Sequence, residues 1–220
     1  MFNKIFDSEN GFWRGMSKVA DIVALNLLFI LCSIPVVTIG ASASAFYTIM
    51  LKLAKNEESY IFKGFIQAFK ENFKKSTIIW LIMFLVGAFA LVDIYLVSNA
   101  GDTFPAAFRY IIYAISFVYF LMLSFVFALQ AKFENSIIGT IKNSLLMGIA
   151  HFLPWGVLIV LVTYLPVLIL LMRLDFVIYL IPLMLIIGFG LLGYINSIFF
   201  NKIFKRYISE EECEELSELN

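Results

Sequence analysis

Charge is scarce in this chain, and its scarcity excludes most soluble folds. Only 15% of the 220 residues are charged and 62% are hydrophobic, whereas soluble domains have about 25% charged and about 45–50% apolar residues. The mean hydropathy of +0.93 agrees with this imbalance. A water-soluble domain cannot bury so large an apolar share, so the composition indicates a membrane protein.

Groups that carry out chemistry are also few. The chain has one histidine and two cysteines, of which Cys32 lies in the first apolar run and Cys213 in the acidic tail. Their separation argues against a disulfide, and neither has metal-ligand spacing. There is no phosphate-binding Gly-Lys-Ser/Thr loop, nucleophile elbow or paired-histidine zinc motif. We therefore expect no catalytic, cofactor or metal site, and an intramembrane enzyme ranks third among the hypotheses.

Long apolar runs are abundant. Several approach or exceed the roughly 20 residues that cross about 30 Å of hydrocarbon. They predict an all-α fold, a polytopic transmembrane helical bundle with six crossings in three hairpins, cytosolic interfacial helices and both termini inside. The expected crossings cover about residues 19–34, 38–53, 78–97, 108–130, 152–172 and 176–200.

The whole chain is expected to form a single membrane domain. Its parts are a first hairpin (1–53), an interfacial helix with a second hairpin (58–130), an interfacial helix with a third hairpin (132–206) and an acidic tail (207–220). A threefold internal repeat starting near residues 1, 58 and 132 stays open, because composition alone produces similarities of this kind.

The first hairpin has the clearest local signals. Proline lacks a backbone donor and restricts the residue before it, so a helix should end near Pro35 and the next should begin near Thr38. Gly40 and Ser44, four residues apart, give the second helix a smooth flank for close packing. The residues that we assign to this structural hairpin motif are Asn26, Pro35, Gly40 and Ser42.

The segment from Tyr60 to Lys75 combines aromatic and basic residues. Its apolar residues recur at three- and four-residue steps, which predicts an amphipathic helix at the cytosolic interface that does not form a crossing. Its lysines would meet anionic headgroups, or the helix would dock a cytosolic partner. The candidate interfacial or partner-docking residues are Phe62, Phe65, Phe69, Lys70, Phe73 and Lys74.

The basic residues are distributed unevenly over the expected topology. With both termini cytosolic, 14 of the 16 basic residues lie inside and only Arg109 and Arg173 face outward, as the positive-inside rule requires. They are spread over several loops rather than one basic face, so nucleic acid is not an expected partner. Residues 1–18 should lie at the bilayer surface, and 98–102 and 173–175 should be turns.

Polar residues within the apolar runs are candidates for function. Asp21, Asp93 and His151 lie near the ends of expected helices rather than at the midplane, where a proton-coupled carrier would need them. Asn196 and Asn26 lie deeper, with Ser116, Ser124 and Thr163. Interhelical hydrogen bonds are one interpretation of these deeper groups, and a site for sugar hydroxyls is the other.

Three motifs together resemble the YesL-like family of uncharacterised bacterial membrane proteins. They are Asn26, the run Cys32–Ser42, and Phe69–Lys74 followed by Trp80. The resemblance is strongest over residues 10–85. It implies a small multi-pass protein of the bacterial cytoplasmic membrane, often associated with genes for carbohydrate uptake and breakdown, and it implies no known catalytic residues.

Two functional hypotheses follow. The first is a non-catalytic accessory component of a carbohydrate-utilisation system, with the lipid bilayer, a carbohydrate transporter subunit or a second copy of itself as partners. The second is a small-solute transporter whose helix breaks line a cavity. A polar-lined cavity reaching the midplane would favour transport, whereas a lateral apolar groove would favour the accessory role.

Overall fold

The computed structural model describes residues 11–57, 60–99, 105–172 and 177–218, and these ranges contain helices and short connections but no strand. The expected all-α fold is confirmed for this part of the chain. The expected turn at 173–175, most of the turn at 98–102 and the surface segment before Gly11 lie outside the described residues.

The elements are α1 (Gly11–Ser33), η2 (Val36–Thr38), α2 (Ile39–Ala54), α3 (Ile61–Asn99), α4 (Ala106–Lys132), α5 (Ile137–Ala150), η4 (Phe152–Gly156), α6 (Val157–Met172), α7 (Val177–Leu183), η6 (Met184–Gly188) and α8 (Phe189–Glu218).

Several helices have the length and composition of membrane spans. Five such stretches occur in the described ranges, namely Gly15–Ser33, Val36–Ala54, Ile61–Asn99, Ala107–Lys132 and Ile178–Ile208. The chain therefore has the helices of a multi-pass membrane protein. Of the six expected crossings, 152–172 is not among them: its backbone is non-helical at Leu153, and α6 has only 16 residues.

The expected interfacial segment 60–75 and the crossing that follows form one helix. α3 runs without interruption from Ile61 to Asn99 over 39 residues, which corrects the expectation of two separate helices. No proline interrupts this stretch, and the polar residues near Ser76 do not end a helix by themselves. A helix of this length measures about 58 Å, about twice the hydrocarbon thickness, so its lysine-rich first part can lie outside the hydrocarbon.

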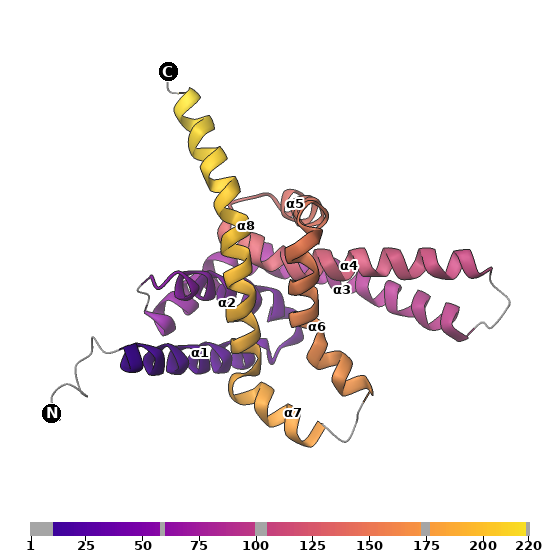
Figure 1. Cartoon of the computed structure of the whole chain (residues 1–220), viewed down its shortest axis with the longest axis horizontal. Helices are drawn as coiled ribbons and strands as arrows, with labels where there is room; N and C mark the ends of the chain where they lie inside the picture. Colours follow the sequence, from indigo (N-terminus) through magenta and orange to yellow (C-terminus); the bar gives the residue numbers. More distant parts are fainter. Residues whose placement is uncertain (1–10, 58–59, 100–104, 173–176, 219–220) are drawn as a thin grey trace.

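The helices form two groups whose axes cross steeply. In Figure 1, α1 and the α3–α4 hairpin run across the view, whereas α6 and α8 run up it. The α3–α4 hairpin projects away from the rest of the molecule. This arrangement differs from a bundle in which all crossings are nearly parallel.

Two glycines of α8 allow the two groups to approach each other closely. A Cβ added to Gly190 would lie 2.7 Å from the carbonyl oxygen of Ile22 in α1, and a Cβ added to Gly193 would overlap the ring of Phe46 in α2. Because a side chain at either position would collide with the neighbouring helix, the crossing depends on small residues.

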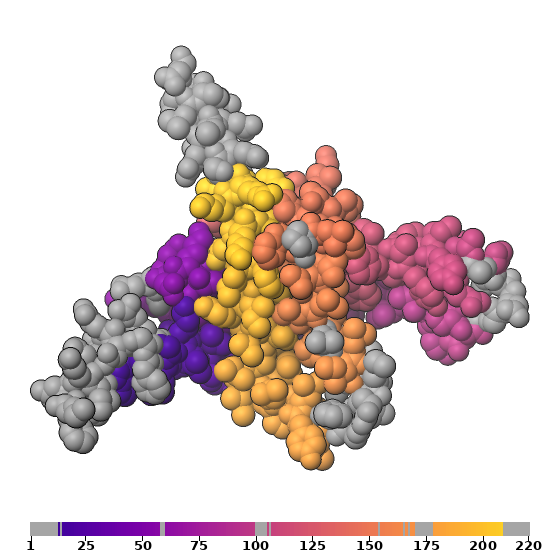
Figure 2. Space-filling view, in the orientation of Figure 1, coloured from indigo at the N-terminus to yellow at the C-terminus, as the bar shows by residue number. Residues whose placement is uncertain are grey.

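The interior consists of three apolar clusters. One joins α1, α2 and the start of α3 around Phe65, and another joins α4, α5, α6 and α8 around Phe125 and Phe200. The third lies between α3 and α4 around Met83. Figure 2 shows α6 and α8 covering the centre of one face of the molecule.

The projecting hairpin turns its apolar side chains outward. Phe89 is 72% exposed, Tyr110 70% and Ile115 64%. Soluble monomers rarely expose apolar surface this continuously, whereas contact with acyl chains accounts for it. The exposed surface of α3 and α4 thus agrees with the hydropathy of their sequences.

Candidate functional site

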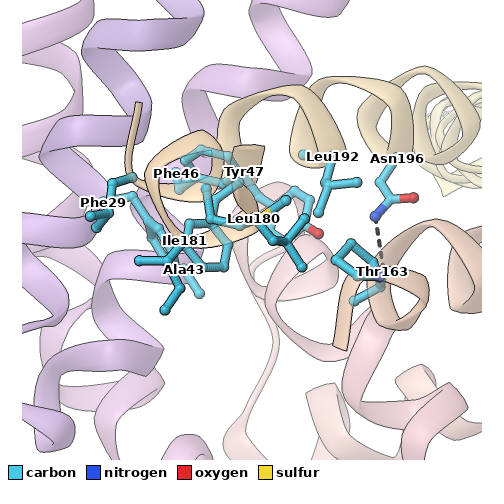
Figure 3. A pocket seen from close by; sticks show the side chains of 14 residues that line it. Phe29, Ala43, Phe46, Tyr47, Thr163, Leu180, Ile181, Leu192 and Asn196 are labelled. Atoms are coloured by element: carbon cyan, nitrogen blue, oxygen red, sulfur yellow. Dashed lines mark hydrogen bonds between the residues drawn. The ribbon is translucent and has the colours of Figure 1, made fainter. Parts of the chain in front are cut away.

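An apolar pocket lies where the two groups of helices meet. Its volume is about 460 Å³, within the range of about 300–1,000 Å³ that is typical of small-molecule sites. Helices α1, α2, α6, α7 and α8 and the turn η6 contribute to its walls (Figure 3). The lining residues are Phe29, Ala43, Phe46, Tyr47, Thr163, Pro166, Leu180, Ile181, Met184, Leu185, Phe189, Leu192, Gly193 and Asn196.

The polar side chains of the lining gather at one end of the pocket. Asn196 donates from Nδ2 to Thr163 Oγ1 at 2.9 Å, the contact drawn in Figure 3. Asn196 is 1% exposed, and its Oδ1 has no hydrogen-bond partner among the described residues. Tyr47, which also lines the pocket, has a side-chain hydrogen-bond interaction with the same amide. The Oδ1 atom is itself buried, so the polar contact of Asn196 joins α8 to α6 and presents no open acceptor to the pocket.

One wall of the pocket is a π-helical irregularity in the last helical stretch, called the break below although the stretch remains helical through it. Residues Met184–Gly188 form a π-helical turn between α7 and α8. Asn26 Nδ2 donates to the carbonyl oxygens of Met184 at 3.2 Å and Leu185 at 2.8 Å, and Asn26 Oδ1 accepts the N–H of Gly190 at 2.8 Å. The Asn26 amide thus pairs backbone groups that the break would otherwise leave open in an apolar interior.

The remaining residues of the hairpin motif join helices and do not line the pocket. Pro35 precedes the short 3-10 turn Val36–Thr38 between α1 and α2. Ser42 Oγ donates to a backbone carbonyl of α1 at 2.9 Å. A Cβ on Gly40 would overlap the carbonyl oxygen of Ser76 in α3. These contacts fix α2 between its two neighbours.

The candidate docking residues at the start of α3 fall into two sets. Phe65 is fully buried and packs with α1 and α2, so the expectation that it faces lipid or a partner is wrong. The reason is that α2 lies against this face of α3: a Cβ on Gly64 would lie 2.9 Å from Ile49. Phe69 is partly buried against the same cluster. The exposed members are Phe62, Lys70, Phe73 and Lys74.

The ionisable residues of the apolar runs are not brought together. Asp93 is exposed on the projecting hairpin, and Asp21 is half-buried in α1. His151 follows α5, with its ring 5.7 Å from that of Tyr207. No three His, Cys, Asp or Glu side chains of the described residues are placed to hold a metal ion. Of the four intramembrane candidates, Asn196 alone reaches the pocket.

Residues 22–94 match the family described as "Protein of unknown function, DUF624". Comparison with curated proteins gave no match, and neither did comparison with solved structures. The matched segment contains Asn26, Pro35 and Gly40 and covers the second half of α1, all of α2 and α3 as far as Ile94. It supplies the α1 and α2 walls of the pocket, whereas α6, α7 and α8 lie beyond it.

Sequence reasoning missed the break beside the pocket. It treated residues 176–200 as one crossing and the glycines there as a packing patch. The stretch Ile178–Ile208 is one candidate span and Gly190 and Gly193 pack closely against α1 and α2, but the π turn at Met184–Gly188 was not foreseen. Pro182 lies inside α7, and a proline in a helix removes a hydrogen bond. Pro182 was therefore a signal in the sequence that could have predicted an irregular helix near this position. The contribution of Tyr47 to the lining had no comparable signal, because it depends on the crossing of distant helices.

Proposed function

We propose that the protein is a non-catalytic component of the bacterial cytoplasmic membrane that assists a carbohydrate-uptake system. The resemblance over residues 10–85 supports the carbohydrate association. The family match over residues 22–94 supports a membrane protein of unknown function. For the topology, we retain six crossings with both termini cytosolic because of the uneven distribution of basic residues. This counts α6 as the fifth crossing, although α6 is shorter than the five candidate spans.

The apolar lining of the pocket is the observation that favours an accessory role over transport. Apart from Tyr47, Thr163 and Asn196, every lining residue is apolar or glycine. A sugar that passes through the protein exchanges water for hydroxyl, amide or carboxylate partners along its path. An apolar lining instead suits packing against acyl chains or against an apolar segment of another molecule.

Transport in its own right is the second candidate, because of the break at η6. Transporters bind substrates where irregular helices expose backbone groups, and Met184 and Leu185 stand at a π-helical turn and line the pocket. Their carbonyl oxygens are already bonded to Asn26. These carbonyl oxygens already have a hydrogen-bond partner within the protein and are not free to bind a substrate, which favours the accessory role.

Affinity purification in mild detergent from the native host tests the proposal. We expect a membrane subunit of a carbohydrate transporter to copurify, identified by mass spectrometry. Phe62 and Phe73 are exposed on the lysine-rich part of α3, so the double variant Phe62→Ser/Phe73→Ser should lose this subunit.

The matched control is Phe89→Ser, which changes an exposed phenylalanine on the projecting part of the same helix. It should retain the subunit. Absence of any carbohydrate transporter subunit from the wild-type sample contradicts the proposal, and uptake of a labelled sugar by liposomes containing the purified protein alone would support the transporter instead.

A further inference from the structure

We propose that the exposed face at the start of α3 binds anionic phospholipids of the cytosolic leaflet. The lipid phosphates accept hydrogen bonds from a lysine stripe, which consists of Lys63, Lys70 and Lys74. The fatty-acid chains contact an apolar stripe, which consists of Phe62, Ile66 and Phe73. The inference rests on the membrane location and topology proposed above, and it does not depend on the transporter subunit.

The two stripes run side by side along the first part of α3. Members of the lysine stripe are seven and four residues apart, and members of the apolar stripe are four and seven residues apart. Residues at these spacings share one face of a helix. An open groove of about 480 Å³ lies where the stripes meet, lined by Phe62, Lys63, Ile66, Gln67 and Lys70. A molecule in this groove touches apolar side chains and ammonium groups together.

The charge of the lysine stripe is not neutralised by the described part of the chain. All three lysines are exposed, and the ion pair found in the described ranges joins Lys55 to Glu57. Glu71 is the acidic residue of this part of α3, and its Oε1 accepts from Gln67 Nε2 at 2.9 Å. The stripe therefore offers a row of ammonium groups to an anion from outside the chain.

The length and direction of α3 bring both stripes to the membrane surface. A helix of about 58 Å exceeds a bilayer with its headgroups, which measures about 40–45 Å, so an upright α3 would carry the stripes beyond the headgroups. The α3–α4 hairpin crosses α6 and α8 steeply (Figure 1), so these two groups cannot both be upright in one membrane. Excess length is accommodated by tilt, which places the first part of α3 among the headgroups.

The apolar stripe favours a lipid over a water-soluble anion. Phe62 is 69% exposed and Phe73 is 41% exposed. Free phosphate would satisfy the lysines and leave these rings in water, whereas a phospholipid covers the rings and supplies the phosphate. A zwitterionic headgroup brings its own cation close to the lysines, so a headgroup with net negative charge fits better.

A binding assay on the full chain in neutral detergent tests the proposal. The probe is phosphatidylglycerol with a fluorescent fatty-acid chain. The competitors are unlabelled phosphatidylglycerol, phosphatidylcholine with the same chains, glycerophosphoglycerol, which is the headgroup without chains, and inorganic phosphate. We expect phosphatidylglycerol to compete at least tenfold better than each of the others, since each lysine near an anionic surface contributes roughly a fivefold gain in affinity. Added sodium chloride should reduce this preference, because salt screens exposed charges.

The triple variant Lys63→Gln/Lys70→Gln/Lys74→Gln locates the effect. Its three positions are exposed, so the fold should persist, which size-exclusion chromatography checks. We expect phosphatidylglycerol and phosphatidylcholine to compete equally in this variant.

The matched control is Lys52→Gln/Lys132→Gln/Lys142→Gln, which makes the same change of net charge at exposed lysines outside both stripes. It should keep the tenfold preference. An equal loss in the control would mean that the general charge of the protein attracts the lipid, which overturns the proposed site.

Equal competition by the two lipids in the wild type overturns the proposal, as does a preference that persists in the stripe variant. Competition by inorganic phosphate or by a polyglutamate peptide as strong as that by phosphatidylglycerol also overturns it, and the peptide result would assign the face to an acidic protein. If the stripe variant fails to fold, the wild-type competition and its salt dependence decide. The assay contains no partner, so its failure and a failure of the copurification test are separate results.

Discussion

Asn26 and Gly190 are joined by a hydrogen bond of 2.8 Å from the glycine N–H to the asparagine Oδ1, although 164 residues separate them. The same amide donates to two carbonyl oxygens of the break before α8. Gly190 has no side chain, which allows α8 to lie against Ile22 and Asn26 of α1. The first helix therefore stabilises an irregular segment of the last one.

Replacing Asn26 with alanine should destabilise the protein strongly. Asn26 is fully buried, so its loss leaves backbone groups unpaired. The expected loss is about 2–4 kcal/mol, since each buried unpaired group costs about 1–3 kcal/mol. Unfolding in detergent by SDS titration measures it.

The control is Asn201→Ala, which removes a single hydrogen bond to the Leu51 carbonyl oxygen. Its loss should be clearly smaller. Equal effects of the two substitutions would mean that the break does not depend on Asn26.

The close approach of α2 and α3 gives a second prediction, at Gly40. A leucine there would overlap the Ser76 carbonyl oxygen and the Trp80 Cβ. We expect Gly40→Leu to lower the detergent melting temperature, by analogy with overpacked cores, which lose about 1–3 kcal/mol.

Gly15→Leu is the matched control, because no described atom beyond its own turn of helix lies within 4 Å of a Cβ added at Gly15. It should melt at the wild-type temperature or slightly above, since leucine favours helix over glycine. Wild-type melting of Gly40→Leu would show that α2 and α3 are not closely packed at this point.

Local signals in the sequence predicted one boundary well and another poorly. The end of α1 before Pro35 follows from the missing N–H of proline, a property of the residue itself. The expected boundary between residues 75 and 78 rested on a change from charged to apolar residues. Such a change means that one part of a helix lies in water and the next part in lipid. It does not break the backbone hydrogen bonds, so α3 continues through it.

The pocket could not be predicted because it depends on contacts between distant segments. Asn196 was recognised as a deep polar residue, with an interhelical bond or a hydroxyl site as its interpretations. Its partner Thr163 lies 33 residues away, and the Met184 carbonyl that Asn26 binds lies 158 residues from Asn26. Periodicity reports which face of a helix is apolar, but not which helix covers that face.

The proposed topology gives a third prediction, tested by cysteine accessibility. The wild-type cysteines are replaced (Cys32→Ala, Cys213→Ser), and a single cysteine is introduced by Asn10→Cys or by Asn99→Cys. In intact cells a membrane-impermeant maleimide should label Asn99→Cys, at the expected outer end of α3, and should not label Asn10→Cys.

Both variants should be labelled after the cells are opened, which controls for the reactivity of each site. Labelling of Asn10→Cys in intact cells would place the N-terminus outside. The positive-inside assignment, which keeps 14 of 16 basic residues cytosolic, would then be wrong.

The last prediction separates the core and surface roles of the phenylalanines at the start of α3. Phe65 is fully buried, whereas Phe62 is 69% exposed, although the two are one helical turn apart. Phe65→Ser removes a large side chain from the cluster that joins α1, α2 and α3. We expect it to lose about 3–5 kcal/mol, as truncation of a buried phenylalanine does. Hydrogen exchange over residues 61–75 should become faster, because the packing that holds this part of α3 on α2 is lost.

Phe62→Ser is the matched control. It should leave stability and hydrogen exchange over residues 61–75 unchanged within error, while removing a side chain that a membrane surface or a partner can contact. Fast exchange over this range in the wild type, or equal effects of the two substitutions, would show that the first part of α3 is not held by the core. An intact helix with reduced partner binding in Phe62→Ser would assign the exposed residues, rather than the whole aromatic set, to docking.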